Sequence, residues 1–197
     1  RLERGEVHVL FGENGAGKST MITLLAGAQQ PSAGSILYNG QPIVLRSVRE
    51  ARALGISAVF QEFSLVATLS VAQNLFLGDE PARHGLIDKR AMTRGAGKVL
   101  ADLGFAIDPG AIVGTLSRAE QQMVEIAKAL RGQIAVLILD EPTASLTGKE
   151  TERLFELIAQ LKARGVGIIY ISHRLQEIRR IGDRVTVLRD GRKIATV

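Results

Sequence analysis

A glycine-rich segment near the start of the chain constrains the fold more than any other feature. Residues 12–20, Gly-Glu-Asn-Gly-Ala-Gly-Lys-Ser-Thr, fit G-x-x-x-x-G-K-[ST], a pattern in which a loop between a strand and a helix binds phosphate. Residues 6–11 before it, Glu-Val-His-Val-Leu-Phe, predict a strand, and residues 18–26 after it predict a helix. Glycine lets backbone N–H groups approach phosphate oxygens, and a helix start adds unpaired donors. The segment therefore predicts a nucleotide site in an α/β fold.

The side chains of this loop have distinct expected roles. We expect Lys18 to reach the β- and γ-phosphates, Ser19 to offer its hydroxyl to Mg²⁺, and Thr20 to bond an inner phosphate. A glycine-rich turn with a surface lysine is the alternative, and the flanking strand and helix disfavour it. The predicted nucleotide-binding residues are Gly12, Glu13, Asn14, Gly15, Ala16, Gly17, Lys18, Ser19 and Thr20.

A second polar motif follows the apolar run 134–139, where Asp140 and Glu141 stand side by side. The carboxyl ends of strands are where an α/β sheet presents its ligands. A phosphate-loop enzyme needs an acid there to hold Mg²⁺, directly or through water, and Asp140 fits that role. Glu141 is then placed to polarise the attacking water as a general base. Two solvated acids at a strand end are the alternative, which the phosphate loop makes less favourable.

The remaining pattern predicts the domain organisation. The runs 134–139 and 166–171 are almost continuously apolar, which is typical of parallel strands covered on both faces by helices. Helical signals dominate from 62 to 132. We therefore predict an α/β core of residues 1–61 and 133–197 with an inserted helical subdomain of residues 62–132.

Several local patterns predict individual elements. Thr147 with Glu150 predicts a capped helix start, and Gly165 follows the expected end of that helix. Asp190-Gly191 predicts a hairpin turn between the strands 184–188 and 192–197. Two apolar stripes predict core helices: Ala96, Val99, Leu100 and Leu103, and Met123, Ile126, Ala127 and Leu130.

Two further predictions concern single residue types. Gly95 and Gly97 should weaken their helix by roughly 1 kcal/mol each. His8 and His84 are expected to be structural or surface residues.

Composition excludes several classes of protein. The chain has no cysteine, which rules out a disulfide framework and thiolate metal sites and suits a reducing compartment. No apolar run reaches the length of a membrane span. The net charge of +5 is spread along the chain without a basic block or aromatic platform, so we expect no nucleic-acid partner. The chain begins with Arg1 and reaches its phosphate loop at once, which suggests an excerpt of a longer protein.

Three more segments, with the two motifs above, resemble the ATPase domain of ABC transporters. Val59-Phe60-Gln61-Glu62 resembles the Q-loop of that family, and Ile171-Ser172-His173-Arg174 resembles its switch-histidine segment. The signature segment is matched by Leu116-Ser117-Arg118-Ala119-Glu120-Gln121-Gln122. All five motifs occur in the family's order. The resemblance implies a P-loop NTPase core of the RecA-like type, with a parallel sheet and an inserted α-helical subdomain.

The resemblance also implies roles for these segments. Gln61 would contact Mg²⁺ and the attacking water, and His173 would contact the γ-phosphate and hold that water. The signature would act in trans, on the ATP held by an opposing ATPase domain. ATP and Mg²⁺ are thus the expected ligands. The implied residues are Glu141, His173 and Gln61 for catalysis; Ser19, Gln61 and Asp140 for the metal; and Ser117, Arg118, Ala119 and Glu120 for the signature contact.

The sequence departs from the family pattern in two places. The usual signature has two glycines after the serine, where this chain has Arg118 and Ala119. Ser117 and Glu120 still predict a capping box, so the helix should still point at its ligand. Arg118 adds bulk and charge, and whether that helps or hinders stays open. In the D-loop, Thr147 stands where many members have aspartate.

Residues 68–78 and 121–130 resemble the monosaccharide importers of the ribose, galactose and xylose type. In that group one polypeptide carries two ATPase domains, and this chain resembles the first of them. The aromatic residue that stacks on adenine in the family would lie upstream of Arg1. The resemblance implies ATP hydrolysis that energises import of a sugar-like solute at the cytoplasmic face of the bacterial plasma membrane. The implied partners are a second ATPase domain, in tandem or as a dimer; an integral-membrane permease; and, indirectly, a solute-binding protein.

Two alternatives belong to other classes. A soluble ABC protein acting on DNA would carry a long coiled coil between Gln61 and Ser117, where only short helices are predicted, and one acting on ribosomes would need a charged linker between its domains. A module that binds nucleotide only to regulate would not need to retain the four residues Lys18, Asp140, Glu141 and His173, all of which are present.

Overall fold

The computed structural model describes all 197 residues, which form two compact units. The first unit consists of Arg1–Val59, Gly132–Pro142 and Ile158–Val197, and the second of Phe60–Arg131 and Thr143–Leu157. The helical unit thus takes in residues 143–157, which the sequence pattern assigns to the α/β part. None of the helices combines the length and the apolar character needed to cross a bilayer.

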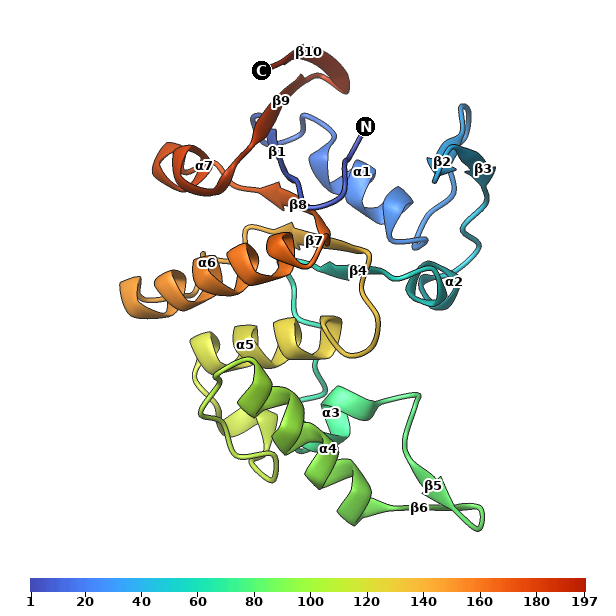
Figure 1. Cartoon of the computed structure of the whole chain (residues 1–197), viewed down its shortest axis with the longest axis vertical. Helices are drawn as coiled ribbons and strands as arrows, with labels where there is room; N and C mark the ends of the chain where they lie inside the picture. Colours follow the sequence, from blue (N-terminus) through green and yellow to red (C-terminus); the bar gives the residue numbers. More distant parts are fainter. The chain divides into compact units, whose positions relative to one another are not determined.

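The first unit is built on a six-stranded sheet with the strand order β10-β9-β1-β8-β7-β4 (Figure 1). Five strands are parallel and β10 is antiparallel, which confirms the predicted parallel α/β sheet. Because Asp140 pairs with Ile171 in the register, the carboxyl ends of β7 and β8 meet at one edge. The strands are β1 (Val7–Phe11), β4 (Ile56–Val59), β7 (Val136–Asp140), β8 (Gly167–Ile171), β9 (Arg184–Arg189) and β10 (Arg192–Thr196).

Shorter elements complete this unit. Helix α1 (Lys18–Leu25) follows the glycine loop as predicted, and β2 (Ile36–Tyr38) and β3 (Gln41–Ile43) form a hairpin. The helices α2 (Val48–Ala53) and α7 (Leu175–Ile181) are also part of it.

The predicted start and end of the long helix α6 (Gly148–Ala163) are confirmed. The N–H and hydroxyl of Thr147 both donate to Glu150 at 2.8 Å. At the other end Gly165 has a φ of 83°, a left-handed conformation that favours glycine.

The second unit is mostly helical. Helix α3 (Val71–Phe76) packs against α4 (Lys89–Asp102) and α5 (Arg118–Ala129). A small hairpin of β5 (Ala82–Arg83) and β6 (Leu86–Ile87) precedes α4 (Figure 1). A 3-10 turn, η1 (Val113–Thr115), precedes α5. The two predicted apolar stripes supply core residues, since the side chains of Ala96, Leu100, Met123, Ile126 and Ala127 are buried.

Gly95 lies where α4 meets α3 closely. A Cβ atom built there would be 2.8 Å from Cζ of Phe76, whereas one at Gly97 would meet Pro109 at an ordinary 3.6 Å. The ring of Phe76 is also stacked under the guanidinium of Arg131, at 4.2 Å. The sequence predicts the same loss of helix stability at both glycines, but their surroundings differ. Gly95 leaves space for the Phe76 ring, whereas no close contact requires glycine at position 97.

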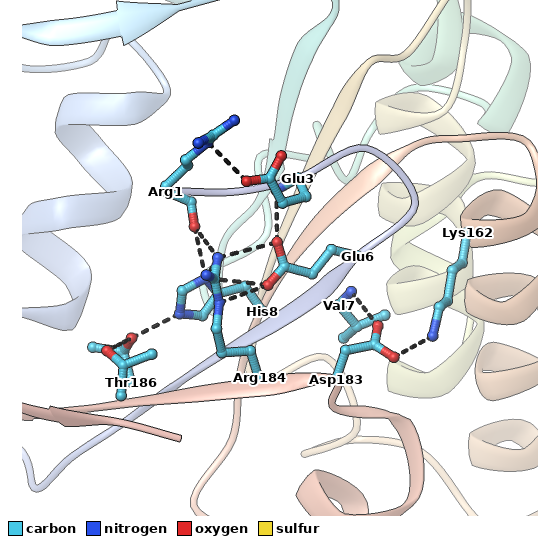
Figure 2. Close-up of polar contacts among 10 residues, drawn as sticks. Arg1, Glu3, Glu6, Val7, His8, Lys162, Asp183, Arg184 and Thr186 are labelled. Atoms are coloured by element: carbon cyan, nitrogen blue, oxygen red, sulfur yellow. Dashed lines mark hydrogen bonds and ion pairs between the residues drawn. The ribbon is translucent and has the colours of Figure 1, made fainter.

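His8 joins the two ends of the chain (Figure 2). Its ring is buried in β1, with Nε2 2.7 Å from the hydroxyl of Thr186 in β9 and Nδ1 3.1 Å from the carbonyl of Arg1. Nδ1 also lies 3.2 Å from Nη2 of Arg184 in β9. Burial lowers the pKa of His8, the hydrogen bond to Arg1 opposes this, and the nearby Arg184 guanidinium lowers it further. The structural role predicted for His8 is confirmed.

Candidate nucleotide site

The predicted phosphate loop is a tight turn between β1 and α1. Gly15 and Gly17 have φ values of 82° and 93°, which side chains with a Cβ rarely adopt. The Nζ atom of Lys18 curls back over the loop and donates to the carbonyls of Gly12 and Glu13, at 2.7 and 2.9 Å. The loop thus holds an ammonium group next to the start of an eight-residue helix, and the first N–H groups of a helix have no partner within it, a setting that suits an anion.

The C-terminal hairpin β9–β10 packs against this loop and forms a backbone hydrogen bond with it. A Cβ atom at Gly12 would lie 2.4 Å from the carbonyl oxygen of Leu188, so only glycine fits. The N–H of Gly191, in the predicted Asp190-Gly191 turn, donates to the carbonyl of Ala16 at 3.2 Å. Nothing in the local motif signals this contact, because its partners are far apart in sequence.

Asp140 ends β7 and is buried, with 9% of the residue exposed. Burial raises the pKa of Asp140, the neighbouring Glu141 carboxylate raises it further, and the Lys18 ammonium lowers it. The first unit therefore brings the predicted metal carboxylate under the electrostatic influence of the predicted phosphate lysine. A divalent cation beside Asp140 would offset the cost of holding its charge in a buried position.

Glu141 and His173 lie together at the edge where β7 and β8 end. Nδ1 of His173 is 3.1 Å from Oε1 of Glu141. Because an ionised carboxylate only accepts, the histidine donates through Nδ1 and keeps Nε2 for another partner. Glu141 also has a φ of 46°, and its N–H donates to the carbonyl of Ile171. An uncommon backbone conformation at a charged residue in a candidate site is typical of functional positions.

Glu177 of α7 holds the segment before His173 in place, a residue that the sequence interpretation missed. Its buried carboxylate accepts from the hydroxyls of Tyr170 at 2.9 Å and Ser172 at 2.8 Å. Ser172 in turn accepts from the N–H of Arg174 at 3.0 Å. The available sequence signal was an acid next to Ile178, the apolar residue that α7 buries. These bonds set the direction in which the chain leaves β8, and so the position of His173.

The other predicted site residues belong to the second unit. Gln61 is exposed, two residues after β4. Ser117 caps α5, and the predicted capping box is confirmed: the Ser117 N–H donates to Glu120 at 2.8 Å, and the Glu120 N–H donates to the Ser117 hydroxyl at 3.2 Å. The Arg118 guanidinium lies over the Phe63 ring, 5.5 Å from its centroid. Ala119 is the next residue of α5.

The fold and the glycine loop together place the protein in the class of phosphate-loop NTPases. Comparison with known proteins identifies the family within this class. A nucleotide-free ATP-binding cassette of an ABC transporter matches the structure with a TM-score of 0.85, at 25% identity, over 99% of this chain and 81% of the other. The sequence model of the ABC transporter family matches residues 1–144. The chain belongs to the ABC transporter family.

Sequence relatives resemble the chain more closely. It is 54% identical over 193 residues to the ribose import ATP-binding protein RbsA 1 of Rubrobacter xylanophilus, which covers 98% of this chain and 39% of the relative. It is 54% identical over 195 residues to a putative ribose/galactose/methyl galactoside import ATP-binding protein of Burkholderia cenocepacia, covering 99% and 38%. The chain thus spans about two fifths of the length of these relatives.

Proposed function

We propose that this chain is an ATP-binding and ATP-hydrolysing part of a transporter that imports a sugar-like solute through a membrane permease. One observation carries the proposal: the first unit gathers Lys18, Asp140 and the Glu141–His173 pair at the carboxyl edge of one parallel sheet. The names of the relatives, which are sugar import ATP-binding proteins, support the solute class.

The donor set suits Mg²⁺ together with ATP. Within the first unit, Ser19 offers a hydroxyl at the start of α1 and Asp140 offers a buried carboxylate. When bound, Mg²⁺ neutralises phosphate charge. The residues of the loop Gly12–Thr20 bind and orient the phosphates, with Lys18 exchanging its bonds to the loop carbonyls for phosphate oxygens.

Hydrolysis needs a group that takes a proton from water, and Glu141 is that group in our proposal. Its Oε1 atom accepts from Nδ1 of His173, and Nε2 of the same ring, when it too carries a proton, would donate to the γ-phosphate. Glu177 keeps His173 in position through Ser172. Ser117 and Arg118 would act on the ATP of an opposing domain, so closure of the two domains completes each site. ATP would favour the closed state by binding it better than the open one.

In this proposal the chain works at the cytoplasmic face of the bacterial plasma membrane, held there by its partners. A second ATPase domain supplies the opposing signature, and a permease converts closure into solute movement. A solute-binding protein delivers the solute. The coupling depends on two assembly states that ATP binds with different affinity.

Lys18→Ala in the full-length protein tests the proposal. Loss of the ammonium should lower phosphate release at saturating Mg·ATP by about a hundredfold or more, the order found for other preorganised electrostatic contacts. Uptake of labelled ribose into proteoliposomes that contain the permease should fall in parallel. Lys193→Ala, which removes an exposed lysine of β10 in the same unit, is the matched control. Wild-type turnover in Lys18→Ala would remove the phosphate-loop assignment.

A further inference from the structure

Two segments with different predicted tasks are joined inside the second unit. Gln61 would contact the nucleotide held by its own domain, whereas Ser117 begins the helix that would contact nucleotide held by the opposing domain. Both lie in the unit that contains Phe60–Arg131. The residues just after Gln61, namely Phe63 and Ser64, contact α5, which is the helix that Ser117 caps.

Ser64 is held by two side chains of α5. Its N–H and its hydroxyl both donate to Oε1 of Glu125, at 3.2 and 2.5 Å. Nζ of Lys128 donates to the carbonyl and the hydroxyl oxygen of Ser64, at 3.1 and 2.9 Å. Every polar group of Ser64 is therefore hydrogen-bonded to α5. Both partners, Glu125 and Lys128, carry charge, and hydrogen bonds to charged groups are shorter and stronger than those between neutral groups.

Glu125 is an unexpected residue for the position it occupies. It is 4% exposed, and its second oxygen, Oε2, is buried without a hydrogen-bond partner. A buried carboxylate is costly unless it is hydrogen-bonded, and both hydrogen bonds that Oε1 of Glu125 accepts come from Ser64. If this position served only the core of the unit, an apolar residue would be more stable there. We therefore attribute the carboxylate of Glu125 to its hydrogen bonds with Ser64.

Phe63 adds a second point of attachment at the other end of the same helix face. The guanidinium of Arg118 lies 5.5 Å from the Phe63 ring centroid, within the range of a cation–π contact. Arg118 and Glu125 are seven residues apart, so they lie about two turns and roughly 10 Å apart on one side of α5. Attachment at two separated points fixes the orientation of a helix as well as its position.

We propose that Phe63, Ser64, Glu125 and Lys128, here called the α5 clasp, transmit movement of the Gln61 segment to the signature helix α5. This inference rests on the proposed function and deepens it by naming positioning residues. A displacement of Gln61, caused by nucleotide or by a permease, is carried to Ser117 because the clasp holds both to one rigid helix. The clasp therefore links the two composite ATP sites through side chains that contact neither nucleotide.

The clasp also accounts for Arg118. At this position the usual signature has glycine, which offers no side chain for Phe63. The arginine extends the clasp to the first residue of α5, directly beside Ser117. The bulk of Arg118 is directed onto Phe63, within its own unit.

Hydrogen–deuterium exchange of the full-length protein, with and without Mg·ATP, tests the clasp. In the wild type we expect exchange to slow in both 60–66 and 117–122. In Ser64→Ala, and more strongly in the Phe63→Leu/Ser64→Ala pair, 60–66 should still slow, whereas the response of 117–122 should shrink on the order of fivefold, within the range of known coupling mutations. Ser64→Thr keeps the hydroxyl and should restore the response.

The same proteins give a kinetic readout. The turnover number at saturating Mg·ATP should fall in Ser64→Ala while the KM for ATP stays unchanged, because the clasp does not touch the nucleotide. Thr93→Ala removes an exposed hydroxyl that bonds only within α4, and it should behave as wild type. Should the double variant fail to fold, Ser64→Ala with its threonine rescue carries the test.

The outcomes separate two failures. If Ser64→Ala shows the full wild-type response in 117–122, or if Ser64→Thr does not restore a lost one, the clasp is wrong and the proposed function stands. A wild type that binds no Mg·ATP removes the proposed function, and the clasp with it.

Discussion

At the scale of single residues, Glu141 is the position where backbone conformation, place in the sheet and hydrogen bonding all bear on the proposed role. It has a left-handed backbone, it follows a buried strand, and it accepts from His173. The sequence predicts its chemistry from its place after Asp140, but not its conformation or its partner. The pair forms because β7 and β8 are neighbours in the sheet, which is a tertiary fact.

Glu141→Gln tests its role as the base. Glutamine has the same shape and the same backbone preferences, and its amide oxygen can still accept from His173, so the local fold should survive. Loss of the base should slow phosphate release on the order of a hundredfold or more while ATP still binds. Single-turnover hydrolysis with a separate ATP-binding measurement checks this, with Glu156→Gln, at an exposed position of α6, as control. Near-normal turnover would transfer the role of base to His173.

At the scale of elements, the helices and strands that the sequence predicts correctly are mostly those with a long hydrophobic pattern. The apolar strands β7 and β8 and the capped helices α5 and α6 were predictable because each contains a full period and an end signal. The hairpins β2–β3 and β5–β6 were not predicted, since strands of three and two residues leave no room for alternation. The contacts of Glu177 and of Glu125 were missed for another reason: they join positions that no local pattern relates.

Helix α4 offers a paired test of packing against propensity. Gly97→Ala should stabilise the chain by roughly 0.5–1 kcal/mol, because alanine favours the helix and the new methyl meets only ordinary contact. Gly95→Ala gains the same propensity but places its methyl 2.8 Å from the Phe76 ring, whose shift would disturb the stack under Arg131. We expect it to be at least about 1 kcal/mol less stable than Gly97→Ala by urea unfolding. Equal stability would show that the ring moves freely.

At the scale of the whole molecule, the network of His8 ties the first residues of the chain to β9 and β10. Its hydroxyl chain runs from His8 to Thr186 and on to Thr196, at 2.7 and 2.9 Å. The same region holds Asp183, which accepts from the N–H of Val7 and pairs with Lys162 (Figure 2). The two ends of the chain therefore share one set of polar contacts.

The pH dependence of stability should report this network. The pKa of His8 is lowered in the folded state, so above the ordinary value of 6.5 both states are neutral and stability is complete. As the pH falls below 6.5 the unfolded chain takes up a proton that the folded chain refuses, and stability declines until the folded pKa is passed. The free energy of unfolding from pH 8 to 5 should decline less steeply in His8→Asn. His84→Asn, at an exposed turn, should keep the wild-type slope; an identical slope in all three would contradict the assignment.

The position of β1 in the sheet has a consequence for anyone who divides this chain. The family model ends at residue 144, yet both neighbours of β1, namely β8 and β9, lie beyond that point. A fragment cut at that boundary would keep the glycine loop, Asp140 and Glu141, and lose every strand that pairs with the one carrying the loop. It would also lose Leu188, whose carbonyl admits only glycine at position 12. The conformation of the glycine loop therefore depends on the hairpin at the other end of the chain, and a fragment that carries the loop into another protein would need that hairpin as well.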